Sequence, residues 1–295
     1  MKVTNKYGMP KALVRAVTND PYTYTGNISV TQMIAPPRLR WLTQRHIDDL
    51  EEDATDRIWT LLGSAVHAIL ERAEDKHSDD LQEIRLETET NGWVWSGQAD
   101  IWQAPDELMD YKVTGAWSVM GDAKPEWEAQ LNLLAFLYRK AGFPVNKLSI
   151  VAIIRDWTKF KMMQSQDYPR RPSTVVAIPL WTDLQCEEYA FKRIALHKNA
   201  EELPDKMLPL CTPEEMWEKP TVYAIMKNKN KRATRVTEDE HEAGILLAHH
   251  RDKQPKEKFM IVERKGKRTR CEDYCAVNFY CNQYNAYLGE EKENA

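Results

Sequence analysis

Residues 92–113 read GWVWSGQADIWQAPDELMDYKV, and this stretch decides the fold. Apolar and polar side chains alternate on both sides of Pro105-Asp106, which predicts two antiparallel strands joined by a turn. With the turn centred on Pro105, residues whose numbers add up to about 210 face each other. Asp100 is therefore expected opposite Asp110.

The second of these strands carries Asp110 and Lys112 on one face, because successive side chains of a strand alternate. The same count places Gln98 opposite Lys112. Two carboxylates directly opposite each other destabilise a sheet unless a cation lies between them, and a divalent metal ion would serve. The pattern leaves two alternatives, a surface ion pair of Asp110 with Lys112 or half of a metal site.

The helix expected over 55–75 carries Gly63, His67 and Glu71 at a spacing of four, so the three share a face. Glycine in a helix interior costs about 1 kcal/mol relative to alanine, which favours a close approach by another backbone. His67 taken alone is typical of an ordinary helix histidine.

The other predicted elements surround this group. Strands are expected over 81–90 and 147–157, with a hairpin turn at Asn91-Gly92. Helices are expected over 124–141, which carries Gln130, and over 181–202, and an N-terminal helix is expected to break at Pro36-Pro37.

The ordered set resembles the RecB-type branch of the PD-(D/E)XK nucleases. It comprises GxxxHxxxE on a helix, SGQAD and DYK on strands, and a helix opening with Gln130, and it spans residues 28–156 in motif order. The resemblance implies a restriction-endonuclease-like α/β core, with a central mixed sheet flanked by helices. It implies Mg²⁺ or Mn²⁺ held by His67, Asp100, Asp110 and the carbonyl of Tyr111, with Lys112 placing the attacking water.

Two positions on the helix over 124–141 bear on this resemblance. The family often has a tyrosine four residues after the glutamine, whereas position 134 is Leu and the aromatic residue comes at Tyr138. Gln130 is still expected in the site, and Tyr138 fits a DNA contact or helix packing equally well.

Three of five cysteines crowd into CEDYCAVNFYC, at Cys271, Cys275 and Cys281. A closed metal or cluster site usually requires a fourth ligand. The family resemblance implies a [4Fe-4S] cluster, and Zn²⁺ is the alternative occupant. Cys211, in a loop-like segment after a proline, is the better fourth ligand, and Cys186 on a helix is expected to be structural. A cluster there would close a long loop.

Composition excludes some classes of protein. With 295 residues, 42% of them hydrophobic, and a net charge of −4, the chain fits a globular protein with a core, not a uniformly basic DNA coat. It has no apolar run long enough for a membrane span and no signal-peptide pattern, so a cytoplasmic protein is expected. The chain is expected to divide into a nuclease core, 1–205, and a basic, cysteine-containing segment, 206–295, packed on it.

Basic residues cluster locally in KNKNKRATR and RKGKRTR. A charge run is usually a solvated face, but two runs flanking the cysteines fit phosphate contacts. The DNA-binding candidates are Arg38, Arg40, Lys229, Lys231, Arg232, Lys267 and Arg268.

These patterns together predict a metal-dependent deoxyribonuclease. The family resemblance favours an exonuclease of phage or bacterial recombination and DNA end processing, with DNA and a phage single-strand annealing protein or recombinase as partners. The alternatives are an inactive nucleic-acid-binding or assembly protein on the same fold, and a CRISPR adaptation nuclease. The present cysteine pattern, which lacks an N-terminal cysteine, weighs mildly against the last.

Overall fold

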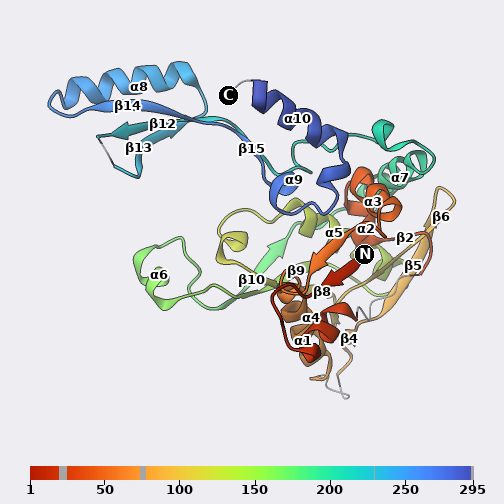
Figure 1. Cartoon of the computed structure of the whole chain (residues 1–295). Helices are drawn as coiled ribbons and strands as arrows, with labels where there is room; N and C mark the ends of the chain where they lie inside the picture. The colour runs from red at the N-terminus through yellow and green to blue at the C-terminus, as the bar shows by residue number, and fades with distance from the viewer. Residues whose placement is uncertain (20–24, 74–77, 229, 294–295) are drawn as a thin grey trace. The chain divides into compact units, whose positions relative to one another are not determined.

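The computed structural model describes residues 1–19, 25–73, 78–228 and 230–293 (Figure 1). The chain forms two compact units, Met1–Pro209 and Leu210–Ala295. The sequence places its boundary slightly earlier, between residues 205 and 206. That the C-terminal segment packs on the core stays a prediction.

The first unit contains the predicted core elements. They are β1 (Lys2–Thr4), α1 (Lys11–Thr18), β2 (Ile28–Ser29), α2 (Val30–Ile34), α3 (Pro37–Arg45), β3 (Glu51–Asp53), α4 (Ile58–Glu71), β4 (Leu81–Gln82), β5 (Arg85–Thr90), β6 (Trp93–Gln98), β7 (Ile101–Gln103), β8 (Glu107–Thr114), the 3₁₀ helix η1 (Ala116–Val119), α5 (Pro125–Lys140), β9 (Lys147–Ile154), α6 (Lys159–Gln164), β10 (Ser173–Ile178), α7 (Asp183–Ala200) and η2 (Asp205–Met207).

A five-stranded sheet in the order β10-β9-β8-β7-β4 forms the centre of this unit. Strands β8 and β9 run parallel and their other neighbours run antiparallel, so the sheet is mixed. Helices α4 and α5 both contact β8. The predicted fold class, an α/β core with a central mixed sheet and packed helices, is confirmed.

The register predicted around Pro105 is confirmed, because Ile101 pairs with Met109 and Trp102 with Leu108. The predicted strand over 92–103 is nevertheless two strands. It breaks at Ala99-Asp100, so β6 lies in a three-stranded sheet with β2 and β5, whereas β7 belongs to the central sheet.

The predicted strand over 81–90 breaks in the same way at Glu83, between β4 and β5. Gln98 consequently pairs with Arg85 in the smaller sheet, and its predicted place opposite Lys112 is wrong. The turn between β5 and β6 is the predicted Asn91-Gly92, both with positive φ, as a tight hairpin of this kind requires.

The predicted helices are confirmed, with bounds shorter by a few residues. Helix α5 begins with Pro125 at its first position, has Glu126 and Glu128 in its first turn and has two cations in its last turn, all of which favour a helix here. Pro36 caps α3 and separates it from α2, as the sequence predicts.

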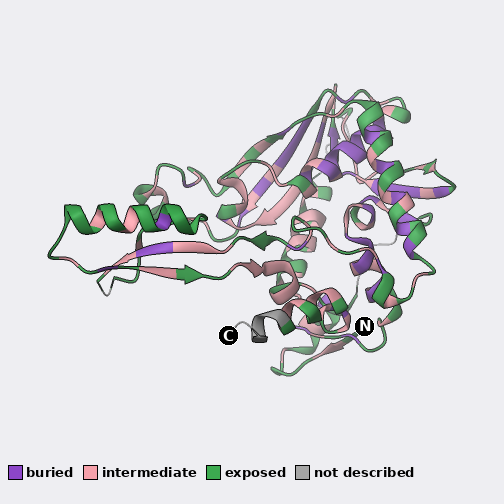
Figure 2. Ribbon diagram, turned by 90° about the horizontal axis from the view of Figure 1, so that it is seen from above, coloured by how far each residue is buried: buried purple, intermediate pink, exposed green. Residues whose placement is uncertain are grey.

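The core of the first unit lies between α5 and the sheets. Ten residues of α5 are buried, and Phe136 stacks on the fully buried Trp95 of β6 at a centroid distance of 6.1 Å. Tyr138 is fully buried too, with its hydroxyl bonded to Ile84 O at 3.3 Å, which supports the helix-packing interpretation of this residue. Figure 2 shows the buried residues along these strands and helices.

The second unit has its own small sheets. Its elements are β11 (Glu218–Lys219), β12 (Val222–Lys227), β13 (Ala233–Thr237), α8 (Glu240–Lys253), β14 (Phe259–Arg264), β15 (Lys267–Arg268), α9 (Thr269–Asp273), η3 (Asn278–Tyr280) and α10 (Asn282–Glu293). Helix α8 packs on the antiparallel sheet β13-β12-β14 and is mostly exposed (Figure 2). In the part of the chain that the structure describes, no helix is long and apolar enough to cross a membrane.

Candidate active site

Two acidic residues face each other where the hairpin changes sheets. Residues paired across β4–β7 and across β5–β6 have numbers that add up to 183, as in Leu81 with Trp102, so the same register places Glu83 opposite Asp100. Glu83 N donates to Asp100 O at 3.3 Å. Glu83 has a φ of 52°, a conformation that residues other than glycine rarely adopt and that often marks a functional site.

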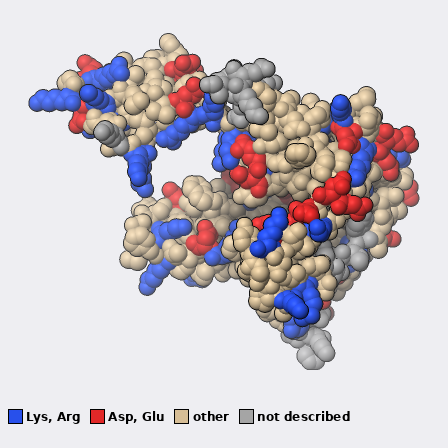
Figure 3. All heavy atoms as spheres, viewed as in Figure 1, with Lys and Arg blue, Asp and Glu red and all other residues tan. Residues whose placement is uncertain are grey.

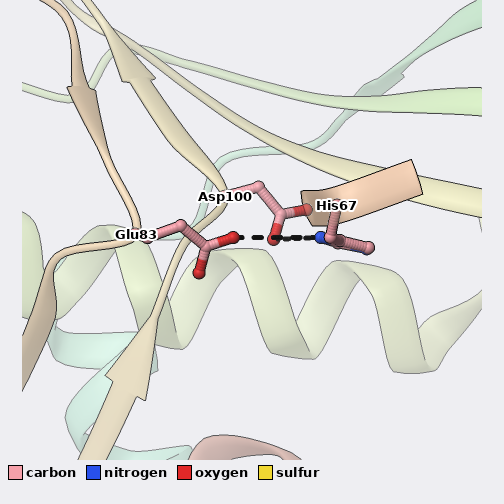
Figure 4. Close-up of side chains that lie close together, drawn as sticks. All are labelled: His67, Glu83 and Asp100. Atoms are coloured by element: carbon pink, nitrogen blue, oxygen red, sulfur yellow. Dashed lines mark ion pairs between the residues drawn. The ribbon is translucent and has the colours of Figure 1, made fainter. Parts of the chain in front are cut away.

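His67 of α4 lies against both carboxylates (Figure 4). Its Nδ1 is 3.1 Å from Asp100 Oδ1 and 3.9 Å from Glu83 Oε1. Hydrogen bonding to Asp100, and then to Glu83, raises the pKa of His67 to about 10. The imidazolium is the cation that lets two opposed acids coexist without a metal ion.

Asp110 and Lys112 form an ion pair beside this group. Lys112 Nζ is 2.5 Å from Asp110 Oδ2, and Gln130 Nε2 donates to Asp110 Oδ1 at 3.0 Å. Only 2% of Asp110 is exposed, and burial raises its pKa to about 6 despite the neighbouring ammonium. The pair is thus not a surface ion pair, and the alternative that it is half of a metal site stays a prediction.

These side chains line one pocket of about 590 Å³. The pocket collects five of the predicted site residues together with Glu83, namely His67, Glu83, Asp100, Asp110, Lys112 and Gln130. Gly63 also lines it, and a Cβ built there would meet nothing within 4 Å. The expectation that a backbone of this chain approaches Gly63 is wrong, because the space before it belongs to the pocket.

Glu83 is a member of the site that the sequence patterns did not predict. Within the described residues, His67, Glu83 and Asp100 are the one group of three or more histidine, cysteine or acidic residues whose ligand atoms lie within 4.8 Å of one another. Glu83 could have been found by counting across Asn91-Gly92, as was done across Pro105. In the sequence, Glu83 has the pattern of an exposed acid in a regular strand.

The predicted ligand set and the observed group overlap in part. His67 and Asp100 belong to both, whereas Asp110 lies outside the closest group and is engaged by Lys112 and Gln130. The ring of Tyr111 lies edge-on to that of His67 at a centroid distance of 6.4 Å, and the backbone N–H of Tyr111 donates to Asp100 Oδ2 at 2.5 Å. A metal ligand role for the Tyr111 carbonyl stays a prediction.

The donor set fits a divalent cation. Two carboxylates and an imidazole converge from three chain segments, and oxygen donors with one imidazole suit Mg²⁺ or Mn²⁺. A cation bound there would replace the proton that His67 holds, since only the neutral imidazole is a ligand.

Two arginines predicted to bind DNA have other partners. Arg38 is 1% exposed, its guanidinium donates to the carbonyls of Leu208 and Pro209, and this burial argues against the predicted phosphate contact. The guanidinium of Arg40 lies over the rings of Trp41 and Trp93, at 4.5 and 5.3 Å from their centroids. Neither arginine lines the pocket that holds His67.

The basic candidates of the second unit are of three kinds. Lys231 and Arg232 are exposed at the β12–β13 turn, and Lys229 lies outside the described residues. Lys267 pairs with Glu272 and Asp273, each at 2.9 Å, and Arg268 lies 3.6 Å from Glu218. These acids neutralise Lys267 and Arg268 locally. Lys231 and Arg232 are therefore the better candidates for phosphate contacts.

Three cysteine thiols of the second unit influence one another. Burial, and then the proximity of Cys275 and Cys281, raises the pKa of Cys271 to about 11. Cys211 is held beside α10, because its N–H donates to Gln283 Oε1 and Gln283 Nε2 donates to its carbonyl, both at 2.9 Å. The four predicted ligands thus belong to one compact unit.

The fifth cysteine differs from the other four. Cys186 of α7 is fully buried in the first unit, and its thiol donates to Asn132 O at 3.4 Å. Burial raises the pKa of this thiol to about 11. Its environment is that of a small core residue.

Comparison with known proteins gives structural likenesses alone. No family model matches the chain, and no curated protein matches it. The crystal structure of SSO0001 is 16% identical with a TM-score of 0.42, covering 64% of this chain and 86% of the other. An alkaline exonuclease from Laribacter hongkongensis is 11% identical with a TM-score of 0.38, covering 59% and 89%.

A third similar structure is that of an exonuclease candidate from Eubacterium rectale, 13% identical with a TM-score of 0.32, covering 50% of this chain and 57% of the other. Two of these three structures are thus described as exonucleases. At such scores a likeness carries no functional conclusion.

Proposed function

We propose that this protein is a metal-dependent deoxyribonuclease that acts as an exonuclease in phage or bacterial recombination and DNA end processing. The observation that carries the proposal is the convergence of Glu83 and Asp100 on His67, in the same pocket as a buried Asp110–Lys112 pair. Hydrolysis of a phosphodiester needs charge neutralisation at the phosphate and an activated water, and a bound Mg²⁺ or Mn²⁺ supplies both.

Each side chain of the pocket has a task in this proposal. His67, Glu83 and Asp100 hold the cation. Asp110, fixed by Gln130 at 3.0 Å, orients the ammonium of Lys112, which stabilises negative charge at the phosphate and positions water. An ammonium is a compact positive charge with three donor hydrogens, so it suits charge stabilisation at the phosphate better than it suits the role of a base.

We also propose that Cys211, Cys271, Cys275 and Cys281 hold a [4Fe-4S] cluster. The four cysteines belong to one compact unit, and Cys275 and Cys281 lie close enough to Cys271 to raise its pKa, which supports a shared metal group. Zn²⁺ remains the alternative occupant, because four thiolates suit it too.

A nuclease assay on the full chain tests the main proposal. End-labelled single- and double-stranded DNA is incubated with Mg²⁺, Mn²⁺ or chelator, beside Asp110→Asn and Lys112→Ala. We expect metal-dependent shortening by the wild type and a loss of at least about 100-fold in both variants. Asp183→Asn, an acid of α7 paired with Arg139 outside the pocket, is the matched control and should cleave normally.

Intact DNA under every condition would contradict the nuclease proposal and favour the inactive nucleic-acid-binding alternative. A phage annealing protein or recombinase stays the predicted partner.

The role of Glu83 is tested by metal binding without catalysis. Glu83→Gln should weaken Mn²⁺ binding, measured by calorimetry, by about 10- to 100-fold, because it removes a ligand charge and a partner of His67. Glu87→Gln, an exposed acid of the neighbouring β5, should bind like the wild type. Equal affinities in the two variants would remove Glu83 from the proposed site.

A further inference from the structure

The strands that carry the pocket end together at one edge of the central sheet. Strands β8 and β9 are parallel, with Thr114 opposite Ile154, and Lys112 lies two residues before this edge. Arg155 N donates to Thr114 O at 2.9 Å, and Ala116 N donates to Asp156 Oδ1 at 2.7 Å. The segments that leave the two strands are thus fastened to each other beside the pocket.

Trp117 is an exposed aromatic residue in the segment that follows β8. It belongs to η1, it is 84% exposed, and within the described residues no ring or cation stacks on it. Its neighbour Ala116 is 1% exposed and packs with Ile154 and Tyr168. The indole is therefore presented by an anchored turn, and an exposed aromatic of this size is typical of a contact surface.

A second exposed tryptophan is connected to this edge through Arg155, the residue whose N–H bonds to Thr114. Trp59 is in the first turn of α4, next to Thr60 of the pocket lining, and is 57% exposed. The guanidinium carbon of Arg155 lies 4.1 Å from its ring centroid. No described residue accepts a hydrogen bond from that guanidinium, so its N–H groups are available to a phosphate while its plane stacks on the ring.

The loop between β9 and β10 adds positive charge at this edge. Residues 155–172 contain five Lys and Arg against two Asp, and one of these, Asp156, accepts the Ala116 N–H. Figure 3 shows Lys and Arg side chains over α6, which belongs to this loop. Aromatic rings beside a cationic loop are what a nucleic acid strand binds through its bases and its phosphates.

We propose that Trp117, and Trp59 with Arg155, form a stacking platform for unpaired bases of single-stranded DNA, whose backbone continues into the pocket of Asp110 and Lys112. This inference deepens the proposed nuclease function and rests on it. Bases in a duplex already stack on one another, so only an unpaired strand offers its ring faces to these tryptophans. The substrate class of the site is then a single-stranded end.

Binding of labelled oligo(dT) to the full chain in chelator, followed by fluorescence anisotropy, tests the platform without hydrolysis. Trp117→Ala should weaken binding by about 5- to 150-fold, and Trp117→Phe should keep most of the affinity. Phe191→Ala, which removes an exposed aromatic ring from α7, is the matched control and should bind like the wild type.

An abasic oligomer with the same number of phosphates separates stacking from charge. Trp117→Ala should bind this oligomer as the wild type does, whereas Arg155→Ala should weaken binding of both oligomers. If Trp117→Ala and Arg155→Ala both bind oligo(dT) as tightly as the wild type, the platform is refuted.

The platform and the nuclease proposal fail in different ways. Weaker oligo(dT) binding by the variants, with DNA left intact by the wild type, would support the platform and contradict the nuclease. Cleavage by the wild type, with unchanged oligo(dT) binding in both variants, would contradict the platform alone.

Discussion

Asp100 lies beside Glu83 and shares a pocket with Asp110, and this gathering of acids is the central feature of the protein at the level of single residues. Counting across Pro105 places it opposite Asp110, and counting across Asn91-Gly92 places it opposite Glu83. Such a row of carboxylates is unstable without a cation, and His67 supplies one in the absence of metal. The sequence predicted the first opposition and missed the second, because Glu83 lies in an otherwise regular strand pattern.

His67 and the other histidine of interest, His197, have opposite environments. His197 of α7 is fully buried, with Nε2 3.1 Å from the carbonyl of Met33, which can only accept a hydrogen bond. Its Nδ1 has no hydrogen-bond partner among the described residues. Burial lowers the pKa of His197 to about 4.

This depressed pKa predicts a loss of stability in mild acid. Between pH 6.5 and pH 4 the unfolded chain binds a proton at His197 that the folded chain does not, so stability falls as pH falls through this window. The free energy of unfolding should drop by about 2 kcal/mol between pH 7.5 and pH 5 on account of this residue. Urea denaturation at several pH values measures it.

The neutral variant His197→Gln should show a shallower decline than the wild type, whatever its absolute stability. The exposed His249→Gln should retain the wild-type slope. Identical slopes for the wild type and His197→Gln would contradict the assignment.

At the scale of elements, the hairpin that runs from β4 to β7 contributes strands to two different sheets. Its outer half, β4 with β7, extends the central sheet, and its inner half, β5 with β6, pairs with β2 in the smaller one. The bends at Glu83 and Asp100 are where the hairpin passes from one sheet to the other, and α4 brings His67 to that point. The site is therefore a product of the change of sheet.

Two glycines of these elements should respond oppositely to alanine. Gly63→Ala should raise the free energy of unfolding by about 1 kcal/mol, because its Cβ meets nothing and alanine favours the helix. Gly97→Ala should lower it by about 1–3 kcal/mol, because its Cβ would collide with Leu134 and Val30. Chemical denaturation measures both.

The Gly63→Ala variant also separates an effect on stability from an effect on activity. Gly63→Ala narrows the pocket and should cleave DNA more slowly although it is more stable, if the substrate passes this part of α4. A Gly63→Ala protein less stable than the wild type would show that the glycine is needed by the fold.

At the scale of the whole molecule, the two kinds of candidate site lie in different units. The acidic pocket belongs to Met1–Pro209, and the four predicted cluster ligands belong to Leu210–Ala295. A substitution that destroys one candidate site should therefore leave the other site formed.

Cysteine substitutions test this separation. Cys275→Ser, purified without oxygen, should lose most of its bound iron and unfold at a lower temperature, since metal binding and folding are coupled. Cys186→Ala should keep the iron, because Cys186 is buried in α7. Iron analysis and thermal unfolding measure the two effects, and stoichiometric zinc with no iron in the wild type would contradict the iron–sulfur assignment.

The sequence alone determined the order of the core strands and helices, the register around Pro105, the turn at Asn91-Gly92 and five residues of the acidic pocket, namely His67, Asp100, Asp110, Lys112 and Gln130. These depend on local signals, namely the period of two in strands, the period of 3.6 in helices and the turn residues. Only the tertiary structure decided that the hairpin changes sheets, that Glu83 joins the site and that Arg38 is buried. The change of sheet and the burial of Arg38 depend on hydrogen bonds and packing between segments far apart in the chain, which no local pattern encodes. The position of Glu83 opposite Asp100 follows from the register at Asn91-Gly92, but its convergence on His67 depends on the packing of α4.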